Sequence, residues 1–283
     1  MDFLAHNEPI IRLSAFLSIF VAMAALELML PRRKGAEYAG TRLKGRRWLT
    51  HGVLTVINSI TLRFVFPAAA VGTALYAQEN GIGLFNVIDV PVIVAAIVAF
   101  LILDFAVWLE HWASHKIPLL WRIHRMHHAD VDFDVTTALR FHPLEILLSM
   151  VWKAAIVLAL GAPLVTVLIF EIVLNGMAMF NHSNFKFPLW LDRIARYFVV
   201  TPDMHRIHHS TRMVETDSNY GFNLSIWDRL FRTYTENPED GHTGMTIGLE
   251  YYRDDKPSDL LWILALPFTA LRDRVLQKKL TGK

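Results

Sequence analysis

Histidines in four short segments are the residues of this 283-residue chain whose spacing points most directly to chemistry. The segments read His-x-x-x-His, His-x-x-His-His, a single histidine within Phe-Asn-His-Ser-Asn, and a second His-x-x-His-His. On a helix, residues three and four positions apart share a face and lie about 5–6 Å apart. Each multi-histidine segment is therefore expected to turn its imidazoles the same way. The members are His111, His115, His124, His127, His128, His182, His205, His208 and His209.

Metal binding explains why so many imidazoles would gather. A neutral imidazole has an acceptor nitrogen that needs a partner, and protonated imidazoles repel one another. A metal ion solves both problems by accepting the lone pairs. Nine histidines exceed what one ion can hold, so we expect two ions. Within each His-x-x-His-His segment, the last two histidines diverge slightly and can serve neighbouring metals.

The donor set limits the choice of metal. Nitrogen donors suit Fe, Zn, Cu and Ni, whereas magnesium and calcium prefer oxygen. The chain has no cysteine, which excludes thiolate zinc sites and cysteine-bound iron–sulfur clusters. The zinc-protease pattern His-Glu-x-x-His is absent, and its inverted form fails at Val107. A redox-active pair of metals is favoured, while a zinc-dependent membrane hydrolase and a metal-transport protein remain alternatives.

Apolar stretches predict the elements that position these histidines. Hydrophobic residues make up 53% of the chain and charged residues 19%, against roughly 25% charged in average soluble domains. The stretches cover residues 13–30, 53–76, 90–109 and 146–180, and Gly161-Ala162-Pro163 interrupts the last. The expected fold is all-α: an integral membrane bundle of about four spans, or two to three plus a re-entrant hairpin, with a histidine-rich helical cap.

Basic residues predict which side of the membrane the cap occupies. Seven of them follow the first apolar stretch, between Arg32 and Arg47, whereas residues 77–84 after the second stretch contain none. By the positive-inside rule the basic segment is cytoplasmic, and counting spans places both histidine-rich regions on that side. The basic segment is also expected to meet anionic lipid headgroups, with docking of an acidic electron donor as the alternative.

Three regions are expected along the chain. Residues 1–95 form an N-terminal transmembrane region with the basic cytoplasmic loop. Residues 96–240 form the histidine domain, including the hairpin at 146–180. Residues 241–283 form a C-terminal tail whose apolar run, 260–271, is too short to span and reads as an interfacial helix or a packing element. A net charge of +2 offers no support for a nucleic-acid partner.

The histidine segments and their surroundings resemble the fatty acid hydroxylase/sterol desaturase superfamily of membrane-bound, non-haem di-iron enzymes. The resemblance covers about residues 104–234 and includes the phrases LWRIHRMHHAD, TALRFHPLE, FNHSNF, TPDMHRIHHS, ETDSNYG and WDRLFRTY. It implies that the nine histidines bind two iron ions. It also implies that dioxygen is activated to hydroxylate or desaturate a lipid such as a sterol or a fatty acyl chain.

Further residues are candidates for a supporting role. His142, within Arg-Phe-His-Pro, is expected to be a ligand or to hydrogen-bond one. Asp104 lies two helical turns before His111, and Asn184 and Asp203 are candidates to accept a ring N–H and orient a ligand, as are Glu110, Glu145 and Asp217. One departure is visible: the chain has Phe-Arg-Thr-Tyr at 231–234 where the family usually has Phe-Gly-Thr-Tyr.

The electrons for such a reaction must come from outside the chain. There is no cysteine for a cluster, no Gly-x-Gly-x-x-Gly for a nucleotide cofactor and no His-Pro-Gly-Gly haem motif. A separate donor of the ferredoxin or cytochrome type is therefore expected as the external reductant. Because the first two histidines directly follow an apolar span, the lipid substrate is expected to keep its apolar part in the bilayer.

Overall fold

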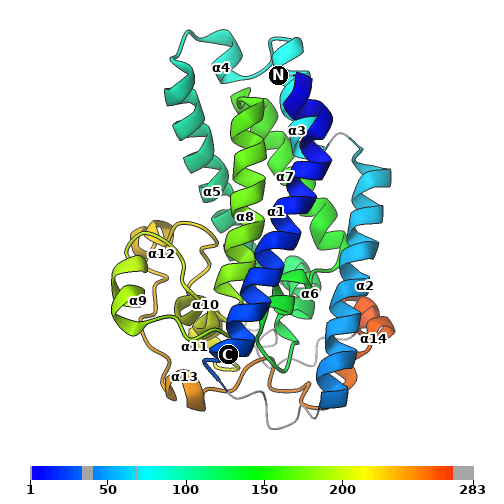
Figure 1. The fold of residues 1–283 in the computed structure, drawn as a ribbon, viewed down its shortest axis with the longest axis vertical. Coiled ribbons are helices and arrows are strands. Elements are labelled where there is room, and N and C mark those ends of the chain that lie inside the picture. The colour runs from blue at the N-terminus through cyan, green and yellow to red at the C-terminus, as the bar shows by residue number, and fades with distance from the viewer. Residues whose placement is uncertain (1, 34–40, 68, 270–283) are drawn as a thin grey trace.

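The long helices of the chain run side by side, and short helices gather at one end of them (Figure 1). The computed structural model describes residues 2–33, 41–67 and 69–269, and these contain no β-strand, only isolated bridges. The all-α prediction is confirmed. The helices of the membrane part are α1 (Asp2–Met29), α2 (Thr41–Val65), α3 (Ala69–Glu79), α4 (Leu84–Val87), α5 (Val92–Lys116), α7 (Pro143–Leu160) and α8 (Leu164–Asn181).

The cap, at the end of the long helices where the short helices gather, is built from ten short helices within the described residues. They are α6 (Pro118–His128), η1 (Val135–Leu139), α9 (Leu189–Ala195), α10 (Pro202–His208), α11 (Met213–Thr216), α12 (Ile226–Leu230), α13 (Gly241–Gly244), η2 (Lys256–Ser258), α14 (Leu260–Ala265) and η3 (Leu266–Phe268). Such short helices depend on tertiary contacts for their stability, because helices of this length are marginal alone.

Within the described residues, five stretches are long and apolar enough to cross a membrane. They are 7–29, 44–87, 92–116, 143–160 and 164–181. The predicted hairpin at 146–180 is present as α7 and α8, with 18 residues in each arm. Each arm is longer than the apolar pattern suggested, since α7 already begins at Pro143, and each reaches a membrane-spanning length.

The turn between α7 and α8 has the chemistry that its sequence predicts. Gly161 adopts φ 61°, the left-handed conformation that ends a helix, and Pro163 then precedes the first residue of α8. Glycine reaches this conformation without the steric cost that other residues bear. The Gly-Ala-Pro sequence therefore reverses the chain sharply at the end of the bundle away from the histidines.

The second apolar stretch, 53–76, lies within one candidate membrane span but is divided between two helices. α2 ends at Val65 and α3 begins at Ala69, on either side of Pro67. Proline cannot continue a helical hydrogen-bond pattern, which explains the break. At its other end α2 extends back to Thr41, so part of the predicted basic loop is helical; residues 34–40 lie outside the described residues.

Small side chains let the central helices approach closely. The core between α3, α5, α7 and α8 contains Ala70, Ala74 and Ala99, each 1% exposed or less, beside larger residues such as Phe170. Small residues at helix contacts are the usual means of close packing in membranes. This packing fixes the lower end of α5, which carries the first two histidines.

The C-terminal apolar run is a packing element as far as it is described. Ile263 of α14 and Leu266 of η3 are fully buried against Trp121 and Met126 of α6. Residues 270–271 of the predicted run lie outside the described residues. The run therefore supports the helix that bears the second histidine segment.

Arg232 occupies the position where the family usually has glycine, and it adopts φ 58°. A left-handed conformation costs a residue with a Cβ about 1–2 kcal/mol. Glycine avoids this cost but loses more conformational entropy on folding, so its net advantage is smaller. We expect Arg232→Gly to stabilise the protein by ~0.5–1 kcal/mol, measured as a higher midpoint of thermal unfolding. Arg232→Ala, which removes the same exposed side chain but keeps the Cβ, is the control and should not stabilise.

Candidate metal centre

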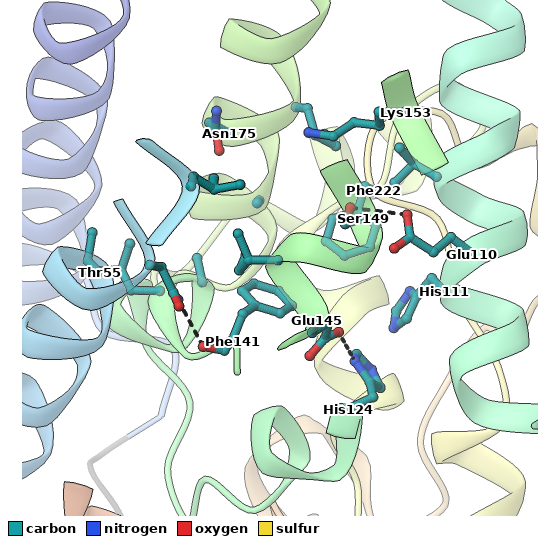
Figure 2. Close-up of a pocket in the computed structure, with 18 of the residues that line it drawn as sticks. Thr55, Glu110, His111, His124, Phe141, Glu145, Ser149, Lys153, Asn175 and Phe222 are labelled. Atoms are coloured by element: carbon teal, nitrogen blue, oxygen red, sulfur yellow. Dashed lines mark hydrogen bonds and ion pairs between the residues drawn. The ribbon is translucent and has the colours of Figure 1, made fainter. Parts of the chain in front are cut away.

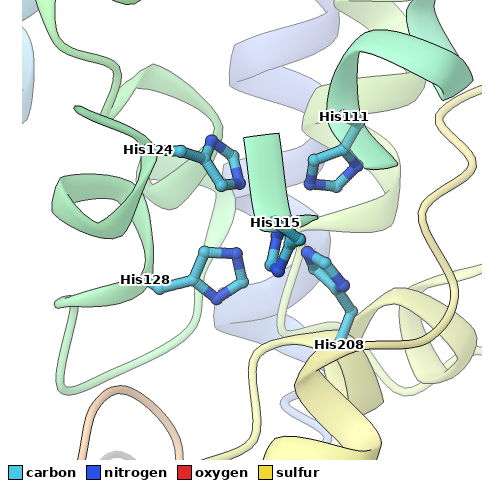
Figure 3. Close-up of side chains that lie close together, drawn as sticks. All are labelled: His111, His115, His124, His128 and His208. Carbon is cyan, nitrogen blue, oxygen red and sulfur yellow. The ribbon is translucent and has the colours of Figure 1, made fainter. Parts of the chain in front are cut away.

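All nine predicted histidines converge in two adjoining groups at the cap end of the bundle. The five-histidine group is His111, His115, His124, His128 and His208, and its rings point toward one another (Figure 3). The four-histidine group is His127, His182, His205 and His209. Within each group one nitrogen from every ring lies within 4.8 Å of all the others, and every member is buried.

The two His-x-x-His-His segments divide their histidines between the groups in opposite ways. His124 and His128, four residues apart, join the five-histidine group, while His127 joins the other. In the second segment the pair four residues apart, His205 and His209, joins the four-histidine group, while His208 crosses to the five-histidine group. The divergence expected from helical geometry is thus present, and each segment contributes to both groups.

Backbone carbonyls fix the orientation of four of the rings. The Nδ1 atoms of His111, His182 and His208 donate to the carbonyl oxygens of Tyr220, Ala178 and Ser218, each at 2.7 Å. His127 Nδ1 donates to the carbonyl of Arg140 at 3.2 Å. A carbonyl only accepts, so the proton must be on Nδ1, and Nε2 of each neutral ring carries a lone pair.

These lone pairs face inward without protein donors. The buried Nε2 atoms of His111, His124 and His208 have no hydrogen-bond partner in the part of the chain that the structure describes. In the other group, His127 Nε2 lies 3.1 Å from His182 Nε2. Since both rings carry their proton on Nδ1, two lone pairs face each other there. A cation between them relieves the repulsion and satisfies the orphaned atoms.

Burial keeps the rings neutral. It lowers the pKa of His182 to about 4 and that of His208 to about 3, because a buried imidazole loses the hydration that stabilises its charged form. The pKa of His127, His128, His205 and His209 is also shifted well below its usual value by burial and by neighbouring histidines. Neutral imidazole is the form that binds a metal.

The arrangement therefore fits two metal ions with nitrogen ligands. The donors are neutral, buried and convergent, and the two groups adjoin where the His128 and His209 rings stack with 4.6 Å between their centroids. Nitrogen-only groups match the preferences of first-row transition metals and not those of magnesium or calcium.

Glu145, at the start of α7, supports the ring of His124. Its Oε1 lies 2.6 Å from His124 Nδ1, so the ring donates to the carboxylate and turns Nε2 toward the five-histidine group. We expect Glu145→Gln to lower metal affinity by about 10–100-fold, the usual effect of losing such a support, in a chelator-competition titration. Glu250→Gln is the control, because Glu250 is exposed and belongs to neither histidine group. An unchanged affinity in Glu145→Gln would contradict this role.

The structure does not bring the other candidate residues into either group. His142 caps α7 by accepting from Leu144 N, and its Nε2 donates to Leu264 O at 3.2 Å. Asp104 accepts from Trp227 Nε1 at 2.8 Å. These two residues hold the cap against the bundle.

Three of the remaining candidates form hydrogen bonds away from the histidine rings, and the fourth, Asp217, lies near one ring. Asn184 exchanges hydrogen bonds with the Arg33 backbone, and Asp203 accepts from Arg32 at 2.9 Å. Glu110 accepts from Ser149 Oγ at 3.1 Å. Asp217 lies closest to a ligand candidate, with its Oδ1 3.6 Å from His115 Nδ1.

Three of the basic residues after α1 are bound within the chain. Arg32 pairs with Asp203, Arg33 donates to the carbonyls of His242 and Met245, and Arg47 is buried between Asp130 and Asp134. These side chains hold the cap to the membrane helices. Arg32, Arg33 and Arg47 are therefore committed to internal carboxylates and carbonyls, whereas Lys44 and Arg46 of the same segment are exposed.

A cavity of about 330 Å³ reaches the five-histidine group from within the bundle. His111 and His124 lie at one side of it, and Lys153 and Asn175 lie at the far side (Figure 2). Its walls come from α1, α2, α5, α7 and α8, and most of its lining is apolar. A membrane-embedded molecule therefore has room beside the candidate metal centre.

Comparison with known proteins assigns the family. Residues 96–233 match the fatty acid hydroxylase family. The chain is 26% identical over 248 residues to the ornithine lipid hydroxylase OlsE of Rhizobium tropici, covering 87% of this chain and 72% of that protein. It is 30% identical over 149 residues to the alkylglycerol monooxygenase of Homo sapiens, covering 52% of this chain and 32% of that protein.

A third relative extends the range of named activities. The cholesterol 25-hydroxylase of Rattus norvegicus is 23% identical over 139 residues, covering 48% of this chain and 45% of that protein. The chain thus spans about a third of the human alkylglycerol monooxygenase and less than half of the cholesterol 25-hydroxylase. No solved structure matches it.

Residues 96–233 belong to the fatty acid hydroxylase family, as the histidine segments within them suggested. The chain is an oxidoreductase of the membrane-bound, histidine-rich class, which sets aside the hydrolase and transporter alternatives.

Proposed function

We propose that the chain is a membrane-bound di-iron oxygenase that hydroxylates a lipid, with dioxygen as oxidant and electrons from a separate donor protein. The observation that carries the proposal is the pair of buried histidine groups, whose ring nitrogens converge and several of which have no hydrogen-bond partner among the described residues. The names of the relatives, hydroxylases and a monooxygenase of lipids, support the type of reaction.

The roles of the chain's own residues follow from their contacts. The nine imidazoles would hold the metals, and the carbonyls of Tyr220, Ala178 and Ser218 keep the rings in one tautomer. Two iron ions held there would supply the redox chemistry that activates dioxygen. Apolar side chains such as Val107, Phe141 and Phe222 line the adjoining cavity together with His111 and His124 and would help to keep water from the reacting carbon. In the net reaction a C–H bond becomes C–OH, the second oxygen atom leaves as water, and two electrons and two protons are consumed.

The experiment that tests this function follows the oxygen atoms. Membranes containing the protein, supplied with a reductase, an electron carrier and isotopically labelled oxygen gas, should yield lipids that carry one labelled oxygen atom. Membranes with His208→Ala should yield none. A desaturase would leave the label only in water. Product formed without oxygen and without reductant would contradict the oxygenase altogether.

We also propose that the histidine groups lie on the cytoplasmic side. The support is the cluster of basic residues at the same end of the bundle as the cap, in agreement with the positive-inside rule (Figure 1).

Because the chain has no cysteine, single cysteines report this orientation cleanly. Glu239 lies in the cap and is 71% exposed, whereas Asn80 is exposed at the opposite end of the bundle, between α3 and α4. An impermeant thiol reagent added to intact cells should label Asn80→Cys and leave Glu239→Cys unlabelled until the cells are opened. The reverse pattern would show that the cap faces outward.

A further inference from the structure

A second hollow reaches the same end of the bundle from the outside of α5 and α7. This apolar groove, of about 420 Å³, is lined by Leu109, Ala113, Leu120, Ile123, Leu148 and Val151 among others. Leu148 and Val151 are 48% and 51% exposed, and both belong to a helix that can span the membrane. The groove therefore opens toward the hydrocarbon of the bilayer.

The apolar groove and the cavity beside the metal centre share a wall. Glu110, Ser114 and Glu145 line both hollows, and the cavity also touches His111 and His124. A molecule that extends from one hollow into the other must therefore pass directly beside the five-histidine group. These three side chains therefore form part of the wall between the two hollows.

The two hollows differ in polarity. Apart from the shared wall, the groove is lined by hydrophobic residues only. The cavity, here called the polar cavity, also presents Asn58, Ser59, Lys153 and Asn175. A chain of CH₂ groups suits the first hollow, and a hydrogen-bonding head suits the second.

Charged groups of both signs line the polar cavity on facing helices. Glu110 of α5 accepts from Ser149 of α7 at 3.1 Å, and Lys153 follows Ser149 by one helical turn, about 6 Å along the same face. Lys153 is 3.3 Å from Glu171, which also pairs with Arg12 at 2.8 Å. Arg12 also pairs with Glu8 at 2.7 Å. The Lys153 ammonium has three N–H donors and one of them contacts Glu171, so it keeps donors for a further acceptor. Charges placed inside a membrane bundle mark a functional site by default, because they are costly there.

We propose that the substrate is a lipid with a zwitterionic head, and that it lies across both hollows. Its anionic group would meet Lys153, its cationic group would meet Glu110, and its hydrocarbon chain would occupy the apolar groove. The carbon at the shared wall then lies beside His111 and His124. This inference rests on the proposed function, because the lipid is a substrate only if the reaction takes place. Its test measures lipid binding and does not require turnover.

The test measures affinities of the purified full chain in detergent for two series of probes. One series is Nα-acyl-lysine, a zwitterionic lipid, and the other is monoacylglycerol, both with increasing chain length. For wild type we expect acyl-lysine to bind about tenfold more tightly than monoacylglycerol of equal chain, the effect of one charge-assisted hydrogen bond. Affinity should rise by up to about fourfold per CH₂ group while the chain fills the groove.

Two pairs of variants separate the head from the chain. Val151→Trp should abolish the gain from longer chains and leave the head preference intact, whereas Ile169→Trp, on an exposed residue of α8 that lines neither hollow, should change neither. Lys153→Met should remove the preference for acyl-lysine, whereas Glu171→Gln breaks the same ion pair without removing a cavity-lining group and should retain it. If Lys153→Met is not recovered folded, Glu110→Gln, which keeps the shape, replaces it.

Either of two results would overturn the inference: equal binding of the two heads by wild type, or an unchanged chain-length dependence in Val151→Trp. Failure of the proposed function is a separate result, because a protein that binds the probes as expected can still form no labelled product from oxygen gas.

Discussion

Replacing His208 by alanine is expected to lower the metal content from about two ions per chain to about one and to abolish turnover. The ring centroid of His208 lies 4.6 Å from those of both His111 and His115, so its removal opens the five-histidine group at its centre. The four-histidine group keeps all its members and should keep its metal. Metal content per chain, measured by mass spectrometry of the elements, gives the first result, and oxygen-dependent product formation gives the second.

Two further variants sharpen this prediction. His205→Ala removes a member of the other group and should also leave about one metal, because the groups are filled separately. His142→Ala is the matched control, since it removes an imidazole that binds only backbone groups. It should keep both metals and lose only about 1 kcal/mol of stability as a helix cap. Full metal content and full activity in His208→Ala would contradict the assignment.

The sequence predicted the histidine groups better than the helices around them. Spacing alone predicts that the last two histidines of each His-x-x-His-His segment diverge, and in the structure His127 and His128 join different groups, as do His208 and His209. The break at Gly161 was equally visible, because both glycine and proline have local backbone requirements. The start of α2 could not be predicted from the sequence, because its first residues are polar and basic and carry no apolar pattern. Their helical state depends on contacts with the cap.

The supporting groups around the rings could be predicted only in part. Glu145 was one of several carboxylates with a suitable position, and spacing could not choose it over Glu110 or Asp203. The role of the Tyr220 and Ser218 carbonyls cannot be predicted from residue types, because every residue has a carbonyl group. The sequence Asn-Tyr-Gly at 219–221 is typical of a turn, and Asn219 adopts φ 53° where the backbone folds back.

The same limit applies to the buried cluster of Arg47, Asp130 and Asp134. Arg47 Nε donates to Asp130 at 2.6 Å, and its Nη1 donates to Asp134 at 2.5 Å. Asp130 follows His128 by two residues, and Asp134 caps η1. Burial alone would raise the pKa of both carboxyl groups, yet the arginine holds each below its usual value. A count of basic residues predicted membrane orientation but could not show this internal role.

Arg47→Met is therefore expected to destabilise the protein by about 3–5 kcal/mol, because it leaves two buried carboxylates without a cation. The neighbouring Arg46→Met is the control: Arg46 pairs with Asp259 at 2.7 Å, but its side chain is 46% exposed, and such surface pairs contribute about 0–1 kcal/mol. Thermal unfolding of both variants in the same detergent measures the difference. Equal midpoints would contradict the argument. A triple variant, Arg47→Met with Asp130→Asn and Asp134→Asn, should recover much of the loss, since no buried charge then remains unpaired in the cluster.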